Sequence, residues 1–469
     1  MNGDLERAGV WRFNHWFGRV KSMTFSPAFK FALVAFLVAR IALTAWSLLI
    51  ALVLPVQVKN LDLFGAPVLA TFDLKTSERH AYSREVNGTV LAFRAGAPGQ
   101  VVDVQTSSGW TLNDGRAVSG TFAGRTLNAS AYTAEDIFPY RGVAAESNLL
   151  LAPWQRFDAN WYVAIAERGY GSIPGDVHFP PLYPALIRLF GVLIGNYFVA
   201  GLLISNLVTI AMLAVLYQMI SEYFDVSVAA HTVVLLLIFP TAFFFFSAYT
   251  ESLFLLAALL SLWSMQKQRW LWAGFWSFCA ILVRLQGIAL FAPLAYALWA
   301  ARPIDKKFAR LISLALPSGA VALYLFIRAV GGDSAIIPTS EPSLFARLVP
   351  PWENYVYALQ TLVSAHFTIA DVLNWLVTTI FVALLVIGWR KLPVIYSLYA
   401  AASVVVLTMR LVDTQPLNSM TRYALTLFPI FILLGIWGKN AWVQRAIVYS
   451  SFPLALFLSA QFVLWGWVG

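Results

Sequence analysis

The chain has 469 residues, of which 59% are hydrophobic and only 12% are charged, about half of the roughly 25% expected of a soluble domain. Together with a mean hydropathy of +0.71, this composition excludes a soluble enzyme, a disordered protein and a nucleic-acid-binding protein. The net charge of +9 lies largely in short loops beside apolar segments, where Lys and Arg set the orientation of membrane helices. Apolar runs of about 20 residues recur along the chain and predict an α-helical polytopic membrane protein with about eleven transmembrane helices.

The N-terminal third divides into three parts. Residues 1–30 are rich in Arg and Lys, which predicts a cytoplasmic segment. Residues 31–54 are predicted to form the first transmembrane helix. Residues 55–145 carry eight basic and eight acidic residues, and they alternate apolar with polar residues between turn signals, as β-hairpins do. Because this part follows the first span, we expect it to be a small extracytoplasmic β-rich insert that binds the acceptor, braces the next loop or contacts a partner.

The remaining chain is predicted to form an outer loop and a helical bundle. Residues 146–196 should be an outer catalytic loop with interfacial helices, because parity allows only one full crossing before the cytoplasmic turn near Glu222. Residues 197–469 should be a transmembrane bundle with an outer loop at 330–370. The ten further spans are expected near 197–221, 229–247, 250–265, 271–284, 287–301, 310–329, 371–389, 393–408, 423–437 and 446–467. Basic loops place the N-terminus in the cytoplasm and the C-terminus outside.

Three arginines are expected at outer helix ends, namely Arg284, Arg410 and Arg422. Guanidinium groups bind phosphate in a bidentate geometry, so three of them on one face predict an outward-facing phosphate site. The alternative is that each side chain only extends to the lipid headgroups. A fourth cation, Arg40, lies inside the first span, where pairing with an acidic residue is expected.

The segment 154–162 combines one carboxylate, Asp158, with several aromatic residues before a helix-like stretch. Aromatic surroundings of low polarity raise the proton affinity of a carboxylate, which suits a general base near neutral pH. The alternative is that Asp158 only caps the helix. Trp161 and Tyr162 are candidates for stacking on a sugar ring, or for packing at the membrane interface.

Two further polar positions are candidates for substrate contact. Glu251 lies between two apolar runs, where it either contacts substrate or occupies the first turn of a helix capped by Thr250. His178 follows Asp176 by two residues, but two ligands are too few to claim a metal site, and a loop histidine is the alternative. No nucleotide-binding loop, dinucleotide fingerprint or zinc-protease motif occurs in the sequence. We therefore expect no required cofactor, although a divalent metal is possible.

Four ordered blocks resemble the GPI mannosyltransferase 2 family and its prokaryotic relatives. The blocks are FDANWY with IAERGY and FPPLYP (157–162, 165–170 and 179–184), FPTAFFFFSAYTESL (239–253), LVRLQG (282–287) and SMTRY followed by Phe428-Pro429 (419–429). The likeness covers about 150–300 and, loosely, the C-terminal third, but it does not cover the insert. In detail, Phe157, Pro180 and Leu285 depart from the family's usual residues.

The resemblance implies a membrane glycosyltransferase of the C-type (GT-C) fold. Such enzymes move a sugar, mannose in this family, from a polyprenyl-phosphate donor to an acceptor on the outer face with inversion. Asp158 would be the general base, and Arg284, Arg422 and Arg410 would hold the donor phosphate. The expected contacts to sugar or acceptor are Trp161, Tyr162, His178, Glu251 and Gln286. The partners would be the lipid donor, membrane lipid and an unidentified glycan, lipid or protein acceptor, in a bacterial plasma membrane.

Two other functions fit the same features. In a polyprenyl-lipid transporter or flippase, the arginines would move an anionic lipid, although the sequence lacks the internal repeats common in transporters. In a non-catalytic assembly subunit of the same fold, the insert would be a docking module.

Overall fold

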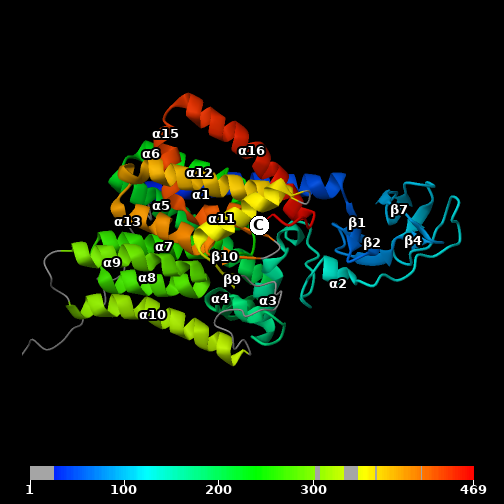
Figure 1. Cartoon of the computed structure of the whole chain (residues 1–469), viewed down its shortest axis with the longest axis horizontal. Helices are drawn as coiled ribbons and strands as arrows, with labels where there is room; N and C mark the ends of the chain where they lie inside the picture. The colour runs from blue at the N-terminus through cyan, green and yellow to red at the C-terminus, as the bar shows by residue number, and fades with distance from the viewer. Residues whose placement is uncertain (1–25, 302–306, 332–346, 365–366, 413–414, 469) are drawn as a thin grey trace, which may run out of the picture.

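The computed structural model describes residues 26–301, 307–331, 347–364, 367–412 and 415–468. Most of the predicted cytoplasmic segment 1–30 lies outside these residues, as do 332–346 and 365–366 of the predicted outer loop 330–370. The described chain is mostly helical. Figure 1 shows the helices gathered in one bundle, with strands β1, β2, β4 and β7 beside one end of it.

Five described helices are long and apolar enough to cross a membrane. They are α1 (Pro27–Val53), α5 (Tyr197–Tyr223), α10 (Lys307–Val330), α12 (Ile369–Gly388) and α16 (Ala441–Val463). A sixth span results if α14 (Met420–Tyr423), η7 (Ala424–Thr426) and α15 (Phe428–Trp437), which bend by 77°, cross together. The long described helices therefore account for about half of the expected spans.

Shorter apolar helices occupy the other expected spans. These are α6 (Val226–Leu237), α7 (Glu251–Gln266), α8 (Trp270–Val283), α9 (Phe291–Ala300) and α13 (Val394–Thr408). The expected span 229–247 stops being α-helical before Pro240 and continues as the 3₁₀ segment η4 (Ala242–Phe246). The expected span 287–301 starts as the 3₁₀ segment η5 (Leu285–Leu290). Because α-helices of this length fall short of a ~30 Å hydrocarbon core, the total of about eleven crossings stays a prediction.

Several shorter elements complete the helical part. They are α2 (Ala134–Ile137), η2 (Ala152–Trp154), α3 (Asp158–Arg168), η3 (Asp176–His178), α4 (Leu182–Ile194), α11 (Pro351–Val363) and η6 (Trp389–Lys391). Helix α4 corresponds to the expected interfacial helix. It buries Tyr183 and Ile187 and exposes Leu189 and Leu193, so it is apolar on its open side. Its placement in the interface stays a prediction.

The strands form small antiparallel sheets. β1 (Val56–Leu63), β2 (Ala66–Asp73) and β3 (Arg79–Ser83) make one sheet, and β6 (Phe93–Ala95), β7 (Gln100–Asp103) and β8 (Gly109–Thr111) make another. β4 (Glu85–Val86) pairs with β5 (Thr89–Val90), and β9 (Arg347–Leu348) with β10 (Arg410–Leu411). Asn87 and Gly88 join β4 to β5 with φ values of 50° and 76°, as a two-residue hairpin loop requires. Leu69, Phe93 and Trp110 are buried in the core of this region.

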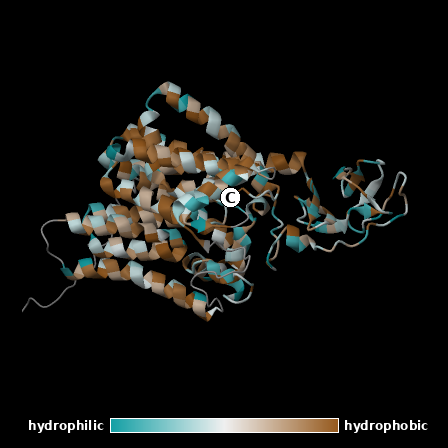
Figure 2. Cartoon of the chain, in the orientation of Figure 1, coloured by the Kyte–Doolittle hydropathy of each residue, from teal (hydrophilic) through white to brown (hydrophobic). Residues whose placement is uncertain are grey.

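The surface of the bundle is apolar. Large apolar side chains such as Val38 and Ile41 on α1, and Val386 and Ile387 on α12, are exposed. Figure 2 shows apolar residues over most of the helical bundle, whereas the strand region is mixed. Exposed apolar surface on this scale marks contact with lipid or protein. With the five long apolar helices, it indicates an integral membrane protein.

Two interior contacts show how closely the bundle is packed. A Cβ atom placed on Gly274 of α8 would lie 2.6 Å from Cα of Ser313 on α10, so a small residue lets the two backbones touch, as is common between membrane helices. On α1, Nη1 of Arg40 donates to the carbonyl oxygen of Phe246 at 2.7 Å, and its guanidinium lies 4.6 Å from the Trp154 ring. The prediction of an acidic partner for Arg40 is wrong: the free carbonyl groups at the end of η4 and an indole face take that role.

Candidate active site

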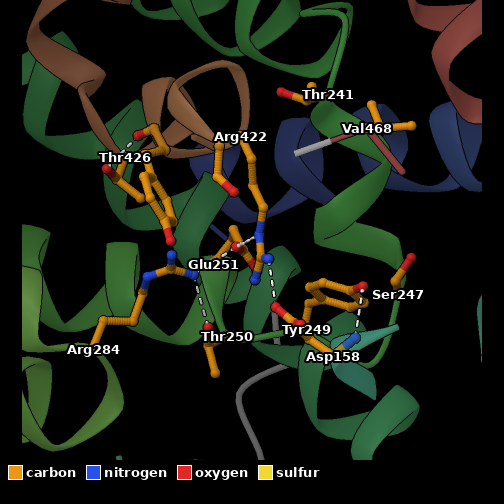
Figure 3. A network of polar contacts seen from close by, with 12 residues as sticks. Asp158, Thr241, Ser247, Tyr249, Thr250, Glu251, Arg284, Arg422, Thr426 and Val468 are labelled. Carbon is orange, nitrogen blue, oxygen red and sulfur yellow. Dashed lines mark hydrogen bonds and ion pairs between the residues drawn. The ribbon is translucent and has the colours of Figure 1, made fainter. Parts of the chain in front are cut away.

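Four charged side chains from four separate segments meet in one cluster (Figure 3). Asp158 begins α3, Glu251 begins α7, Arg284 directly follows α8, and Arg422 lies on α14. Up to 264 residues separate two directly bonded members, so only the tertiary fold brings them together. We call these four residues the charged cluster.

Arg422 is the centre of the charged cluster. Its Nη1 donates to Oδ2 of Asp158 at 2.5 Å, and its Nε donates to Oε1 of Glu251 at 2.5 Å. Its guanidinium also lies 4.9 Å and 4.6 Å from the rings of Phe244 and Tyr249. Only 3% of the Arg422 side chain is exposed. Arg422 therefore bridges two carboxylates.

Arg284 and Arg410 lie on either side of Tyr423. Nη1 of Arg284 donates to Oε1 of Glu251 at 2.6 Å and to Oγ1 of Thr250 at 2.9 Å, and its guanidinium lies 4.7 Å from the Tyr423 ring. Nη1 of Arg410 donates to the Tyr423 hydroxyl at 3.1 Å. The structure thus brings the three predicted arginines together, although Arg422 is buried and Arg284 and Arg410 are partly exposed.

The two carboxylates of the charged cluster differ in exposure. The side chain of Asp158 is 19% exposed, whereas that of Glu251 is completely buried. Oε2 of Glu251 has no hydrogen-bond partner among the described residues. Asp158 is therefore the carboxylate that a substrate hydroxyl can reach, and Glu251 is the one that holds two arginines in place.

Asp158 takes its position from the residue before it. The backbone of Phe157 has φ 48° and ψ −114°, a conformation that is rare for a residue with a side chain and that is found mostly at functional sites. The Phe157 ring packs against Phe462, Trp465 and Trp467 with centroid distances of 6.0, 5.3 and 5.1 Å. The N–H of Asp158 donates to the Tyr249 hydroxyl at 3.2 Å. No side chain caps α3, so the prediction that Asp158 only caps this helix is wrong.

Arg156 is a second buried cation next to the site. Its Nε donates to the carbonyl of Val463 at 3.1 Å, and its Nη1 donates to the carbonyls of Ala152 and Gln155 at 2.8 and 3.0 Å. Its guanidinium lies 5.1 Å from the Phe72 ring and 4.9 Å from the Trp465 ring. Burial lowers the pKa of Arg156 below its ordinary value. We call Arg156 and the rings packed around it the aromatic clamp, which comprises Phe72, Phe138, Tyr140, Arg156, Phe157 and Trp465.

Of the residues predicted to contact sugar or acceptor, two pack against protein groups. Tyr162 is buried, and its hydroxyl shares a hydrogen bond of 3.3 Å with Oγ1 of Thr250. Gln286 is also buried; its Nε2 donates to Oγ1 of Thr426 at 2.7 Å, which ties η5 to η7. Gly287 of η5 packs directly against α8, since a Cβ atom at this position would lie 2.6 Å from the backbone nitrogen of Ile281.

The two other predicted contacts lie on the α3 side of the site. Trp161 is half-buried; it stacks on Phe179 with a centroid distance of 5.2 Å and lies under the guanidinium of Arg141 at 4.5 Å. His178 lies in η3, and its carbonyl oxygen accepts a hydrogen bond of 2.9 Å from Tyr324 of α10. Neighbouring Asp176 is buried and accepts from the backbone N–H groups of Gly171, Ser172 and Ile173, so it shapes its own loop.

The sequence reasoning missed several residues of the site. Tyr249 and Thr250 directly precede Glu251 in the sequence, and Tyr423 directly follows Arg422, so adjacency to a nominated charge was the available signal. Arg141 had no such signal, since it lies in the part predicted as the insert. Among the described residues, no group of three or more His, Cys, Asp or Glu side chains is placed to hold a metal ion.

Comparison with known proteins gives one family match and two structural neighbours. Residues 178–329 match the family model described as dolichyl-phosphate-mannose-protein mannosyltransferase. Two crystal structures of the oligosaccharyltransferase of Archaeoglobus fulgidus are similar to the chain, one with Zn and sulfate and one in the apo form. Each has 14% sequence identity, and the TM-scores are 0.37 and 0.35; 65% and 67% of this chain is covered. The chain spans about half the length of these proteins, 49% and 51%.

No curated protein matches the chain. The family model covers Glu251 and Arg284 but stops short of Asp158 and Arg422. The apolar helices indicate an integral membrane protein, and its residues 178–329 are similar to that mannosyltransferase family. The resemblance to the GPI mannosyltransferase 2 family in particular is not confirmed.

Proposed function

We propose that the chain is an integral-membrane glycosyltransferase that moves a sugar, in our proposal mannose, from a polyprenyl-phosphate donor to an acceptor hydroxyl. The reaction takes place on the extracytoplasmic face of a bacterial plasma membrane and inverts the anomeric carbon. One observation carries the proposal: the partly exposed carboxylate of Asp158 is held in a single bonded cluster with Arg422, Glu251 and Arg284. The family match over 178–329 supports the class of reaction.

Asp158 acts as the general base. The acceptor oxygen attacks the anomeric carbon, the bond from that carbon to the phosphate oxygen breaks, and polyprenyl phosphate leaves with the bonding electrons. The carboxylate of Asp158 accepts the hydroxyl proton as the new glycosidic bond forms. The ion pair with Arg422 at 2.5 Å keeps this carboxylate in one place, which favours a productive geometry.

Arg284 and Arg410 hold the donor phosphate in this proposal. The two carboxylates and the two arginines of the charged cluster balance each other in charge. Arg410 adds a further positive charge beside Tyr423, next to Arg284. Cations in a site of low polarity stabilise the charge that develops on a leaving phosphate. Arg422 bridges two carboxylates and is only 3% exposed, so we assign it the role of a positioning residue.

The test is transfer from defined donors. Membranes that contain the chain would be incubated with labelled polyprenyl-phosphate mannose or polyprenyl-phosphate glucose, with and without chelator, beside membranes without the chain. The proposal expects a labelled product that depends on the chain and favours the mannosyl donor. Absence of any transfer, together with movement of a labelled polyprenyl phosphate across vesicles that contain the purified chain, would instead support a transporter. Activity that returns only after adding a second protein would support an assembly subunit.

A further inference from the structure

Arg141 presents a cation on the α3 side of Asp158. It lies between α2 and α3, and its guanidinium lies 4.5 Å from the ring of Trp161. Trp161 is three residues after Asp158 on α3, so both side chains project from one face of the helix. Burial lowers the pKa of Arg141, and the carboxylates of Glu135, Asp136 and Asp158 oppose that shift. Arg141 and Asp158 therefore lie close enough for their charges to interact.

The backbone of Arg141 is fixed on both sides. Its φ is 58°, a left-handed conformation that costs energy for a residue with a side chain. Its N–H donates to Oε1 of Glu135 at 2.5 Å, and its carbonyl oxygen accepts a hydrogen bond from Nη2 of Arg168. Glu135 also pairs with Arg79 of β3 at 2.8 Å. A strained backbone held by three elements keeps the Arg141 side chain in one direction.

The guanidinium of Arg141 packs on the Trp161 ring but is bonded to no acceptor group in the described part of the chain. Among the described residues, it makes no hydrogen bond and no ion pair, and its Nε is buried without a partner. In this it differs from Arg284 and Arg422, whose guanidinium groups are bonded to carboxylates. An anionic ligand can therefore bond to this guanidinium without displacing a protein carboxylate.

We propose that Arg141 binds an anionic group, a carboxylate or a phosphate, on the sugar acceptor. This inference rests on the proposed function. In an inverting displacement, the acceptor and the leaving phosphate lie on opposite sides of the anomeric carbon. The base must touch the acceptor hydroxyl, and the cations that hold the phosphate must lie beyond the sugar. Arg141 shares the α3 side with the exposed base, whereas Arg284 and Arg410 flank Tyr423 of α14. The two groups of cations therefore serve two different anions.

The experiment compares matched neutral and anionic sugars. Binding of octyl glucoside, octyl glucuronide and octyl glucoside 6-phosphate would be measured on the full-length protein in nanodiscs, for the wild type, Arg141→Gln, Arg141→Lys and the control Arg94→Gln. Arg94 is exposed in β6, within the strand region. The proposal expects preference for an anionic sugar and a loss of about tenfold or more for that sugar alone in Arg141→Gln, as for a charge-assisted hydrogen bond. Arg141→Lys keeps part of the preference, and Arg94→Gln keeps all of it.

Three results would overturn the proposal. Equal loss of neutral and anionic sugars in Arg141→Gln would show that Arg141 only holds the loop. Loss of polyprenyl-phosphate binding in the same variant would assign Arg141 to the donor. Equal binding of neutral and anionic sugars by the wild type would remove the anion site. Because Asp158→Asn leaves Arg141 in place, anion preference in that variant tests this inference separately from transfer.

Discussion

Two arginines are buried close to Asp158, and they have opposite kinds of hydrogen-bond partner. Arg422, in the charged cluster, is bonded to the carboxylates of Asp158 and Glu251. Arg156, in the aromatic clamp, is bonded to three carbonyl oxygens and lies between aromatic rings. No ion pair of Arg156 occurs within the described part of the chain. Both side chains are almost completely buried.

The difference separates two tasks that meet at Asp158. The ion pairs of Arg422 hold charged carboxylates in fixed positions, where their charge can act on a reaction. The carbonyl groups and ring faces around Arg156 only hold its guanidinium in place. The charged cluster therefore sets the electrostatic surroundings of Asp158, the base of our proposal. The aromatic clamp sets its position, because Arg156 and Phe157 directly precede Asp158. The clamp includes Phe72 of β2 and Tyr140, so the strand region packs against the residues that precede α3. Of the three roles expected for the insert, bracing this segment is the one that the contacts favour.

The largest effect on stability is expected when Arg422, the central cation of the charged cluster, is replaced. Arg422→Leu leaves Asp158 without its cation and Glu251 with Arg284 only, and we expect a loss of about 3–5 kcal/mol in stability, as when a buried pair is broken. Thermal unfolding of the purified protein in nanodiscs measures this. Arg422→Lys is the matched control: it keeps the charge but does not bridge two carboxylates, so it should lie between the wild type and Leu. Equal stability of all three proteins would contradict the account of the charged cluster.

Replacing Arg156 should lower the stability of the protein without changing donor binding. In Arg156→Met, the buried carbonyls of Val463 and Gln155 lose their donor, which costs about 1–3 kcal/mol for each unpaired group, partly offset because the buried charge is removed. We expect a lower thermal midpoint together with an unchanged affinity for polyprenyl phosphate. Arg156→Lys should recover part of the stability. A variant that loses donor binding without losing stability would show that the clamp and the cluster are not separate.

The smallest expected effect is a pH dependence of stability in the strand region, which depends on Asp103. Burial raises the pKa of Asp103, but hydrogen bonds from Thr106, Trp110 and Ser108 outweigh it and hold the pKa below the ordinary 3.8. A carboxylate whose pKa is lower in the folded than in the unfolded protein stabilises the fold at any pH above its unfolded pKa. This stabilisation is lost as the pH falls through the pKa of the folded state.

We therefore expect amide exchange in residues 100–112 of the full-length protein to quicken below about pH 4 relative to intrinsic rates, by an amount matching about 1–3 kcal/mol. Asp103→Asn should be less protected at pH 7 and show a weaker pH response. Asp62→Asn is the control, since Asp62 is exposed in β1, outside this window. An unchanged pH response in Asp103→Asn would contradict the prediction.

Sequence reasoning found the charges of the site but not their contacts. Asp158 is a candidate because it is a lone carboxylate among aromatic residues, whereas Glu251, Arg284 and Arg422 are candidates because each is a charge beside an apolar run. Their mutual bonds could not be read from the sequence, since 33 to 264 positions separate the bonded partners. Pattern alone also could not show that Arg422 pairs with two carboxylates.

Other outcomes depended on tertiary packing. Tyr162 was expected at a sugar, but it is buried against Thr250 and Tyr183. Arg40 is predicted to lie beside an acid, but among the described residues its guanidinium donates a hydrogen bond to the carbonyl oxygen of Phe246, the last residue of η4. The turn Asn87-Gly88 was readable, since φ > 0 at two successive positions has a strong residue preference. The conformation of a turn depends on its own residues, whereas the partners of a buried charge depend on the tertiary structure.

The central claim is that Asp158, held by Arg422, is the base of a glycosyl transfer. The most direct measurement is single-turnover transfer from labelled polyprenyl-phosphate mannose by purified wild type and Asp158→Asn at equal donor occupancy. The account predicts a rate about 10²–10⁴-fold lower in the variant, the range attributed to general base catalysis, with donor affinity and thermal midpoint little changed. A variant that transfers sugar within a few-fold of the wild type would contradict it.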